Sequence, residues 1–161
     1  MDLALWLTTF RALHEKSKRG GLDGAEDQDY RAGREELARA LVSAQRLTTL
    51  PGQSPRHALR VARALQVDLE SPVRKDRLTT FDLSLGGFSA LLARAPMPDE
   101  VLTATLRLSG VEPVVAQVTV AGMKAQPGNV RVSFAFAKLD GPVAERLEVA
   151  IFDAVLAQLG Q

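Results

Sequence analysis

The chain has 161 residues, of which 46% are hydrophobic and 24% charged, and its formal net charge is +1. These proportions are ordinary for a soluble globular protein, and the balanced charge argues against general nucleic-acid binding, which needs a basic excess. There are no cysteines, which excludes disulfides and cysteine-based metal sites. No apolar run approaches the roughly 20 residues that cross a bilayer, and the N-terminal residues lack the pattern of a signal peptide. We therefore expect a cytoplasmic protein without a membrane or nucleic-acid partner.

The N-terminal part of the chain predicts two helices. Residues 2–18 have an amphipathic pattern with Asp2 placed to cap it, and RGGLDGAEDQD then predicts a flexible connection. A second helix is expected from about Asp29 to Leu47, and LPGQSP ends it because proline cannot continue a helix. We expect residues 1–50 to form a helical hairpin in which Trp6 and Phe10 pack against the second helix.

After this hairpin the pattern changes to short runs rich in Val, Thr, Leu and Phe, separated by Pro, Gly or Asn. They predict about six strands: ALQVDL, DRLTTFDLSL, FSALLA, VLTATLRL, PVVAQVTVAG and NVRVSFAF. Because no helix lies between them, they favour an antiparallel sheet or a small closed barrel. The last stretch, DGPVAERLEVAIFDAVLAQL, predicts a helix capped by Asp140, with an apolar stripe made of Leu147, Ile151, Ala154 and Val155. The expected fold is α+β and mainly β, with a barrel domain over residues 54–161.

The stretch FDLSLGGFSALL, residues 81–92, places polar groups at the end of a predicted strand. Strict alternation predicts a core face made of Thr79, Phe81, Leu83 and Leu85. The same alternation places Asp82 and Ser84 side by side on the outer face, and Gly86 and Gly87 then permit a sharp turn or a close approach to a ligand. A carboxylate and a hydroxyl suit the Watson–Crick edge of guanine, which presents N–H donors. A strand end followed by a turn is the simpler interpretation.

The second feature is a group of arginines upstream of that strand. Seven basic residues and three acidic ones lie between Arg46 and Arg77, and Arg56 and Arg60 form an R-x-x-x-R pattern. A guanidinium group binds phosphate through a bidentate fork and stacks on a base. The cluster therefore indicates a phosphate or guanine ligand, with a solvated basic face as the alternative.

The two features together resemble the PilZ-domain family, in which R-x-x-x-R at the first strand is followed by D-x-S-x-x-G, here Asp82, Ser84 and Gly87. The order of strands and the C-terminal helix fit the resemblance over residues 54–160. It implies a six-stranded antiparallel barrel that binds the bacterial second messenger cyclic di-GMP. Arg56 and Arg60 would wrap over the ligand, Asp82 and Ser84 would contact a guanine, and Gly87 would keep the backbone open beneath it.

The sequence departs from the family's pattern in two places. Many members have a second arginine directly before the R-x-x-x-R motif, where this chain has Pro55. Arg63 occupies a position of the first strand that is often apolar in the family. Arg63 is therefore a further candidate for a ligand contact, as is Gly86 beside Gly87.

The resemblance implies a signalling protein without catalytic activity. Ser84 lacks the G-x-S-x-G elbow of a hydrolase, and neither His14 nor His57 stands in a triad pattern. We expect a cyclic di-GMP effector, without cofactor or metal, that couples ligand binding to an unidentified protein partner. The alternative is a PilZ-like interaction module for motility or pilus assembly that does not bind the nucleotide. Its two amphipathic helices would suit a partner or a homodimer. A general anion or RNA binder is disfavoured by the six Phe, one Tyr and one Trp, which form no stacking stripe.

Overall fold

The computed structural model of the chain describes residues 2–47, 59–108 and 111–159. Arg56, His57 and the predicted LPGQSP turn lie outside these residues. The chain divides into two compact units, residues 1–59 with 156–161 and residues 60–155. The assignment of residues 1–50 and 54–161 to separate domains remains a prediction.

Two helices form the N-terminal segment, as predicted: α1 (Leu3–Lys18) and α2 (Gly24–Leu47). The Asp2 carboxylate accepts a hydrogen bond of 3.0 Å from the Ala4 backbone N–H, which caps α1. The helix α2 begins about five residues earlier than predicted, because Asp23 and Glu26 cap it reciprocally. The Glu26 N–H donates to the Asp23 carboxylate at 2.8 Å, and the Asp23 N–H donates to the Glu26 carboxylate at 3.3 Å.

The two helices meet through a row of aromatic rings. Trp6 stacks on Phe10 with 5.3 Å between ring centroids, and Phe10 stacks on Tyr30 of α2 at 5.5 Å. Next to them, His14 Nδ1 lies 2.6 Å from the Tyr30 hydroxyl, and both side chains are buried. Both rings also lie beside Gly33 of α2, where a Cβ atom would be 2.9 Å from the Phe10 ring and 3.7 Å from the Trp6 ring. Phe10 and Trp6 thus pack against the second helix as predicted.

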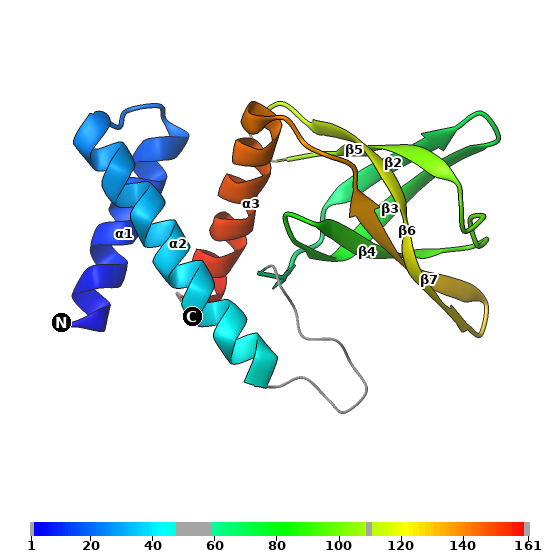
Figure 1. Ribbon diagram of the computed structural model, residues 1–161, viewed down its shortest axis with the longest axis horizontal. Coiled ribbons are helices and arrows are strands. Elements are labelled where there is room, and N and C mark those ends of the chain that lie inside the picture. Colours follow the sequence, from blue (N-terminus) through cyan, green and yellow to red (C-terminus); the bar gives the residue numbers. More distant parts are fainter. Residues whose placement is uncertain (1, 48–58, 109–110, 160–161) are drawn as a thin grey trace. The chain divides into compact units, whose positions relative to one another are not determined.

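Antiparallel strands make up the barrel: β2 (Gln66–Ser71), β3 (Arg74–Leu83), β4 (Gly87–Leu92), β5 (Val101–Leu106), β6 (Val114–Gln126) and β7 (Asn129–Phe136). Their order is β3-β2-β5-β6-β7-β4, and a further pairing of β3 with β4 closes the barrel (Figure 1). A two-residue strand, β1 (Val61–Ala62), pairs with the end of β3 and lies in line with β2 along the same edge of β3. The six-stranded closed barrel predicted from the sequence is confirmed.

Alternation builds the interior of the barrel, as β5 and β6 illustrate. Their buried residues face one another directly, in the pairs Leu102–Val118, Ala104–Ala116 and Leu106–Val114. Burying one such leucine or valine side chain contributes about 1.5–3 kcal/mol relative to leaving it exposed. The intervening residues of β5 and β6 face outward, which accounts for the exposed Thr103 and Gln117.

The strand β3 departs from the predicted alternation. Of the four residues expected on the core face, only Leu83 is buried, whereas Thr79, Phe81 and Leu85 are exposed and Thr80 is buried instead. For Thr79 to Phe81 the cause is a β-bulge: Thr80 pairs with Ala90, but Asp82 pairs with the adjacent Ser89, so Phe81 is an extra residue. Leu85 lies beyond the end of the strand. The prediction of the core face was therefore wrong because it assumed a regular strand.

The C-terminal helix α3 (Gly141–Leu159) follows the barrel strands, as predicted. The Asp140 carboxylate accepts a hydrogen bond of 2.8 Å from the Val143 N–H and caps the helix, and Pro142 lies in the first turn. The predicted apolar stripe of Leu147, Ile151, Ala154 and Val155 is buried. Within the described residues, none of the helices combines the length and the apolarity needed to cross a membrane.

Candidate ligand-binding site

Asp82 lies near two arginines on the outer face of the barrel. Its carboxylate Oδ2 is 3.7 Å from a guanidinium nitrogen of Arg60, which precedes β1, and 3.9 Å from one of Arg131 in β7. The Asp82 side chain is 16% exposed, so it remains accessible from outside while most of its surface is covered. The structure therefore brings together two of the predicted residues, Arg60 and Asp82, and adds Arg131.

Arg131 was missed by the sequence reasoning. It faces outward in β7 between inward-facing neighbours, and β4 separates β7 from β3 in the sheet. Its guanidinium carbon lies 5.1 Å from the centroid of the Phe81 ring, which is a cation–π contact. Only the pairing order of the strands reveals that Arg131 and Asp82 are neighbours, because 49 positions separate them in the sequence.

Ser84 holds the turn that follows β3. Its hydroxyl oxygen accepts hydrogen bonds from the backbone N–H groups of Gly86, at 3.1 Å, and Gly87, at 3.2 Å. The hydroxyl also lies 3.4 Å from the Gly87 carbonyl, to which it donates, and the residue is 5% exposed. Ser84 is thus not exposed beside Asp82 on the outer face, because the strand has ended and the chain is turning. Its contact with a guanine stays a prediction.

The two glycines of the turn differ in what surrounds them. A Cβ atom on Gly87 would lie 1.8 Å from the Phe134 carbonyl oxygen, since the backbones of β4 and β7 approach closely there. A Cβ atom on Gly86 would meet only the Ser84 hydroxyl, at 3.7 Å. The barrel itself therefore requires a glycine at position 87, whereas the ligand-binding roles predicted for both glycines stay predictions.

The segment between β1 and β2 is fastened to β3 by the buried Thr80. The Thr80 hydroxyl accepts a hydrogen bond of 2.9 Å from the Leu65 N–H and donates to the Arg63 carbonyl. The Arg63 N–H donates to the Phe81 carbonyl at 3.2 Å. The backbone of Arg63 is consequently held beside the bulge, which keeps the chain from Arg60 onward next to Asp82. Whether its side chain contacts a ligand stays a prediction, as does the role of Arg56.

A second group of one aspartate and two arginines lies elsewhere on the barrel. The Asp68 carboxylate accepts hydrogen bonds from Arg107, at 2.7 and 3.1 Å, and from Arg77, at 3.1 Å. The hydrogen bond from Arg107, followed by that from Arg77, lowers the pKa of Asp68 below its ordinary value. The Asp68 carboxylate and the two guanidinium groups thus neutralise one another through close hydrogen bonds, which is typical of a structural ion-pair group.

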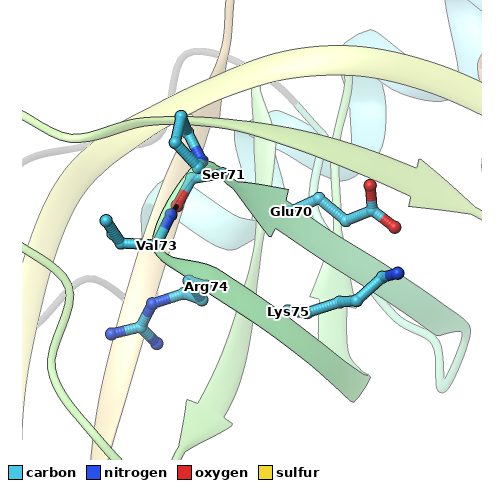
Figure 2. Close-up of a pocket in the computed structure, with 6 residues that line it drawn as sticks. Glu70, Ser71, Val73, Arg74 and Lys75 are labelled. Atoms are coloured by element: carbon cyan, nitrogen blue, oxygen red, sulfur yellow. Dashed lines mark hydrogen bonds between the residues drawn. The ribbon is translucent and has the colours of Figure 1, made fainter.

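A cavity of about 400 Å³ lies at the turn between β2 and β3, at the far end of β3 from Asp82. It is lined by Glu70, Ser71, Pro72, Val73, Arg74 and Lys75 (Figure 2). Arg74 is already engaged: it donates to Asp76 at 2.8 Å and to the carbonyls of Arg94 and Ala95 at 3.1 and 3.2 Å. Of the predicted site residues that the structure describes, none lines this cavity. In residues 2–47, 59–108 and 111–159, no three His, Asp or Glu side chains are grouped as metal ligands.

Solved structures of PilZ-domain proteins share the fold of this barrel. The PilZ domain of YcgR from Escherichia coli, solved with cyclic di-GMP, is 17% identical with a TM-score of 0.56, covering 66% of this chain and 96% of that one. MotI/DgrA, an inhibitor of motility from Bacillus subtilis, is 18% identical with a TM-score of 0.56, covering 68% and 54%. The MrkH–cyclic di-GMP complex of K. pneumonia is 17% identical with a TM-score of 0.55, covering 68% and 56%.

These likenesses confirm the predicted PilZ-like fold. At such low identity the likeness concerns the fold, and the matched region spans only about half the length of MotI/DgrA and MrkH. No protein-family model and no curated protein matches the sequence.

Proposed function

We propose that this chain is a non-catalytic cyclic di-GMP effector that acts in the bacterial cytoplasm and passes the signal on through a protein–protein contact. The observation that carries the proposal is the group of Asp82, Arg60 and Arg131 on the outer face of a PilZ-like barrel. The PilZ domain of YcgR, which has the same fold, was solved with cyclic di-GMP, and this supports the choice of ligand.

Cyclic di-GMP offers the groups that these side chains recognise. Its phosphates are anions that guanidinium groups bind, and the Watson–Crick edge of guanine donates N–H groups that the Asp82 carboxylate can accept. The carboxylate is largely covered, so a hydrogen bond made there competes less with water than one on an open surface. By the resemblance, Arg56 would join Arg60 on the ligand. Because the Ser84 hydroxyl is engaged in the turn, we propose that Ser84 acts by positioning that turn.

The proposal is tested by isothermal titration of the purified protein with cyclic di-GMP. Arg60→Ala and Asp82→Ala should each lower the affinity about 10- to 100-fold, since each removes one charge-assisted contact. Asp68→Ala and Arg77→Ala are the matched controls, because they remove an aspartate and an arginine from the Asp68 group. The affinities of these two variants for cyclic di-GMP should stay within about twofold of that of the parent protein, because distant sites act independently. Cyclic di-AMP should bind more weakly, because adenine presents an acceptor where guanine presents a donor.

A second candidate function is a PilZ-like interaction module that does not bind the nucleotide. It is favoured by the contacts that Asp82 already makes with two arginines and by the Ser84 hydroxyl being committed to the turn. The exposed Leu3 and Leu5 of α1 also suit a contact with a partner or a second copy. Absence of heat at high cyclic di-GMP concentration, with the protein folded, would contradict the first proposal and favour this one.

A further inference from the structure

The bulge in β3 places an aromatic ring beside the Asp82 carboxylate. In a regular strand, neighbouring residues point to opposite faces. Here Phe81 and Asp82 both stand opposite Ser89, so the two side chains share the outer face. Phe81 is 43% exposed, whereas Phe88 and Phe134 in the same barrel are each 2% exposed. Among the described residues of the barrel, Phe81 is the sole aromatic side chain exposed to this extent.

Arg131 connects the ring to the carboxylate. Its guanidinium carbon lies 5.1 Å from the centroid of the Phe81 ring, and one of its nitrogens lies 3.9 Å from Asp82 Oδ2. A guanidinium plane and an aromatic ring are the two surfaces on which nucleic-acid bases stack in proteins. Both surfaces therefore lie within reach of a base whose hydrogen-bonding edge faces Asp82.

We propose that Phe81 and Arg131 form a stacking subsite in which a guanine base inserts between the ring and the guanidinium group. The inference rests on the proposed function and deepens it, because it assigns two residues outside the R-x-x-x-R and D-x-S-x-x-G motifs to the ligand. Asp82 accepts hydrogen bonds from the Watson–Crick edge of the guanine, while Phe81 and Arg131 stack on the two faces of that base. The class of ligand is a purine nucleotide whose phosphates lie near Arg60.

The present geometry needs only a small change to admit the base. Two stacked contacts, one on each face of the base, require about 7 Å between the ring and the guanidinium plane, at about 3.5 Å each. The guanidinium carbon is 5.1 Å from the ring centroid, which is the largest spacing that the two planes can have, so Arg131 has to move outward by about 2 Å or more. The Arg131 side chain is 46% exposed, and its contacts, a long ion pair with Asp82 and an exposed cation–π contact with Phe81, are both weak.

Titration of variants with cyclic di-GMP tests the subsite. Phe81→Leu keeps an apolar side chain but removes the π face, and Arg131→Gln removes the charge. Each should lower the affinity about 5- to 100-fold, the effect of losing one stacking partner of a base. Arg131→Lys should recover only part of the loss, because an ammonium group has no plane to stack. Arg77→Gln, another exposed arginine of the outer face, should leave the affinity unchanged.

Fluorescence detects stacking directly. If residue 81 had only a structural role, ligand binding would not quench the emission of a tryptophan at that position. The protein has one tryptophan, Trp6, in the N-terminal helix. Phe81→Trp places a second indole in the subsite, and cyclic di-GMP should quench its emission while the emission of the parent protein, from Trp6 alone, stays constant. Circular dichroism and thermal unfolding verify that each variant is folded.

The possible outcomes separate this inference from the proposed function. If the parent protein binds cyclic di-GMP, but Phe81→Leu and Arg131→Gln bind it equally well and Phe81→Trp is not quenched, the subsite is wrong and the proposed function stands. If the parent protein does not bind cyclic di-GMP, the proposed function and the subsite are both wrong. Weakened binding in both variants together with quenching supports the subsite.

Discussion

Asp68 and Asp82 each lie between two arginines on the same barrel, but at different distances. Asp68 is hydrogen-bonded to Arg77 and Arg107 at 2.7–3.1 Å, whereas the ion-pair distances from Asp82 are 3.7 and 3.9 Å. The strand order explains the contrast. Asp68 and Arg77 are directly paired across β2 and β3, where side chains are about 5 Å apart, while Arg131 reaches Asp82 from two strands away, about 10 Å.

The contrast separates a structural group from a candidate site made of the same residue types. In the Asp68 group the donors and acceptors satisfy one another, so a ligand would have to break close hydrogen bonds to enter. The two ion pairs of Asp82 are longer than hydrogen bonds, so a ligand can replace these two contacts at little cost in free energy. Composition alone does not distinguish the two groups, whereas the distances do.

The largest expected effect comes from Gly87→Ala, which breaks the Asp82 end of the barrel without changing a charge. The new Cβ would collide with the Phe134 carbonyl and force β4 away from β7, which separates Asp82 from Arg131. We expect a loss of about 3 kcal/mol or more in the free energy of unfolding, or roughly 6–12 °C in Tm. Urea and thermal unfolding measure it. Gly86→Ala is the control, and equal stability of the two variants would contradict the clash.

An intermediate effect is expected from Thr80→Val, which removes the hydroxyl that fastens the segment before β2 to the bulge. Valine keeps the shape but leaves the Leu65 N–H and the Arg63 carbonyl without their hydroxyl partner. The free energy of unfolding should fall by about 1–3 kcal/mol. Thr79→Val, on the exposed side of the same strand, should change it by no more than about 0.5 kcal/mol. Equal effects in urea unfolding would show that the Thr80 hydroxyl does not fasten the segment.

The smallest effect concerns pH and the Asp68 group. Because hydrogen bonds from Arg107 and Arg77 lower the pKa of Asp68, its charged form stabilises the folded state at pH values above the ordinary 3.8. That contribution is lost as the pH falls through the lowered pKa. The stability difference between the parent protein and Asp68→Asn should therefore be constant from about pH 7 to 5 and shrink below about pH 4. Urea unfolding across this range measures it, and a constant difference would exclude the lowered pKa.

Regular features of the fold could be predicted from the sequence. Each predicted strand run overlaps an observed strand, because alternation between apolar and polar residues dictates which side faces the barrel interior. The caps at Asp2 and Asp140 could also be predicted, because a capping side chain bonds the backbone two or three residues further along the chain. The start of α2 was predicted about five residues too late, although the capping-box spacing of Asp23 and Glu26 is visible in the sequence. At the candidate site, the structure places Arg60 and Asp82 together, as their motifs indicated.

The remaining features depend on pairing between strands, which a single sequence does not display. The bulge at Phe81 is invisible in the pattern of TTFDL, since a threonine at either position 79 or 80 fits either face. Arg131 joins Asp82 only because β4 lies between β3 and β7. The need for glycine at position 87 depends on the backbone of β7.

The bulge also bears on how such a barrel can change over generations. Phe81 is one residue more than the pairing of β3 with β4 requires, and the residues on either side of the Phe81–Asp82 pair, Thr80 and Leu83, are both buried. Removing its single codon would leave a strand with regular alternation, in which Asp82 keeps its face. An outer-face aromatic residue can therefore be gained or lost here in one insertion or deletion, while the interior of the barrel is inherited unchanged.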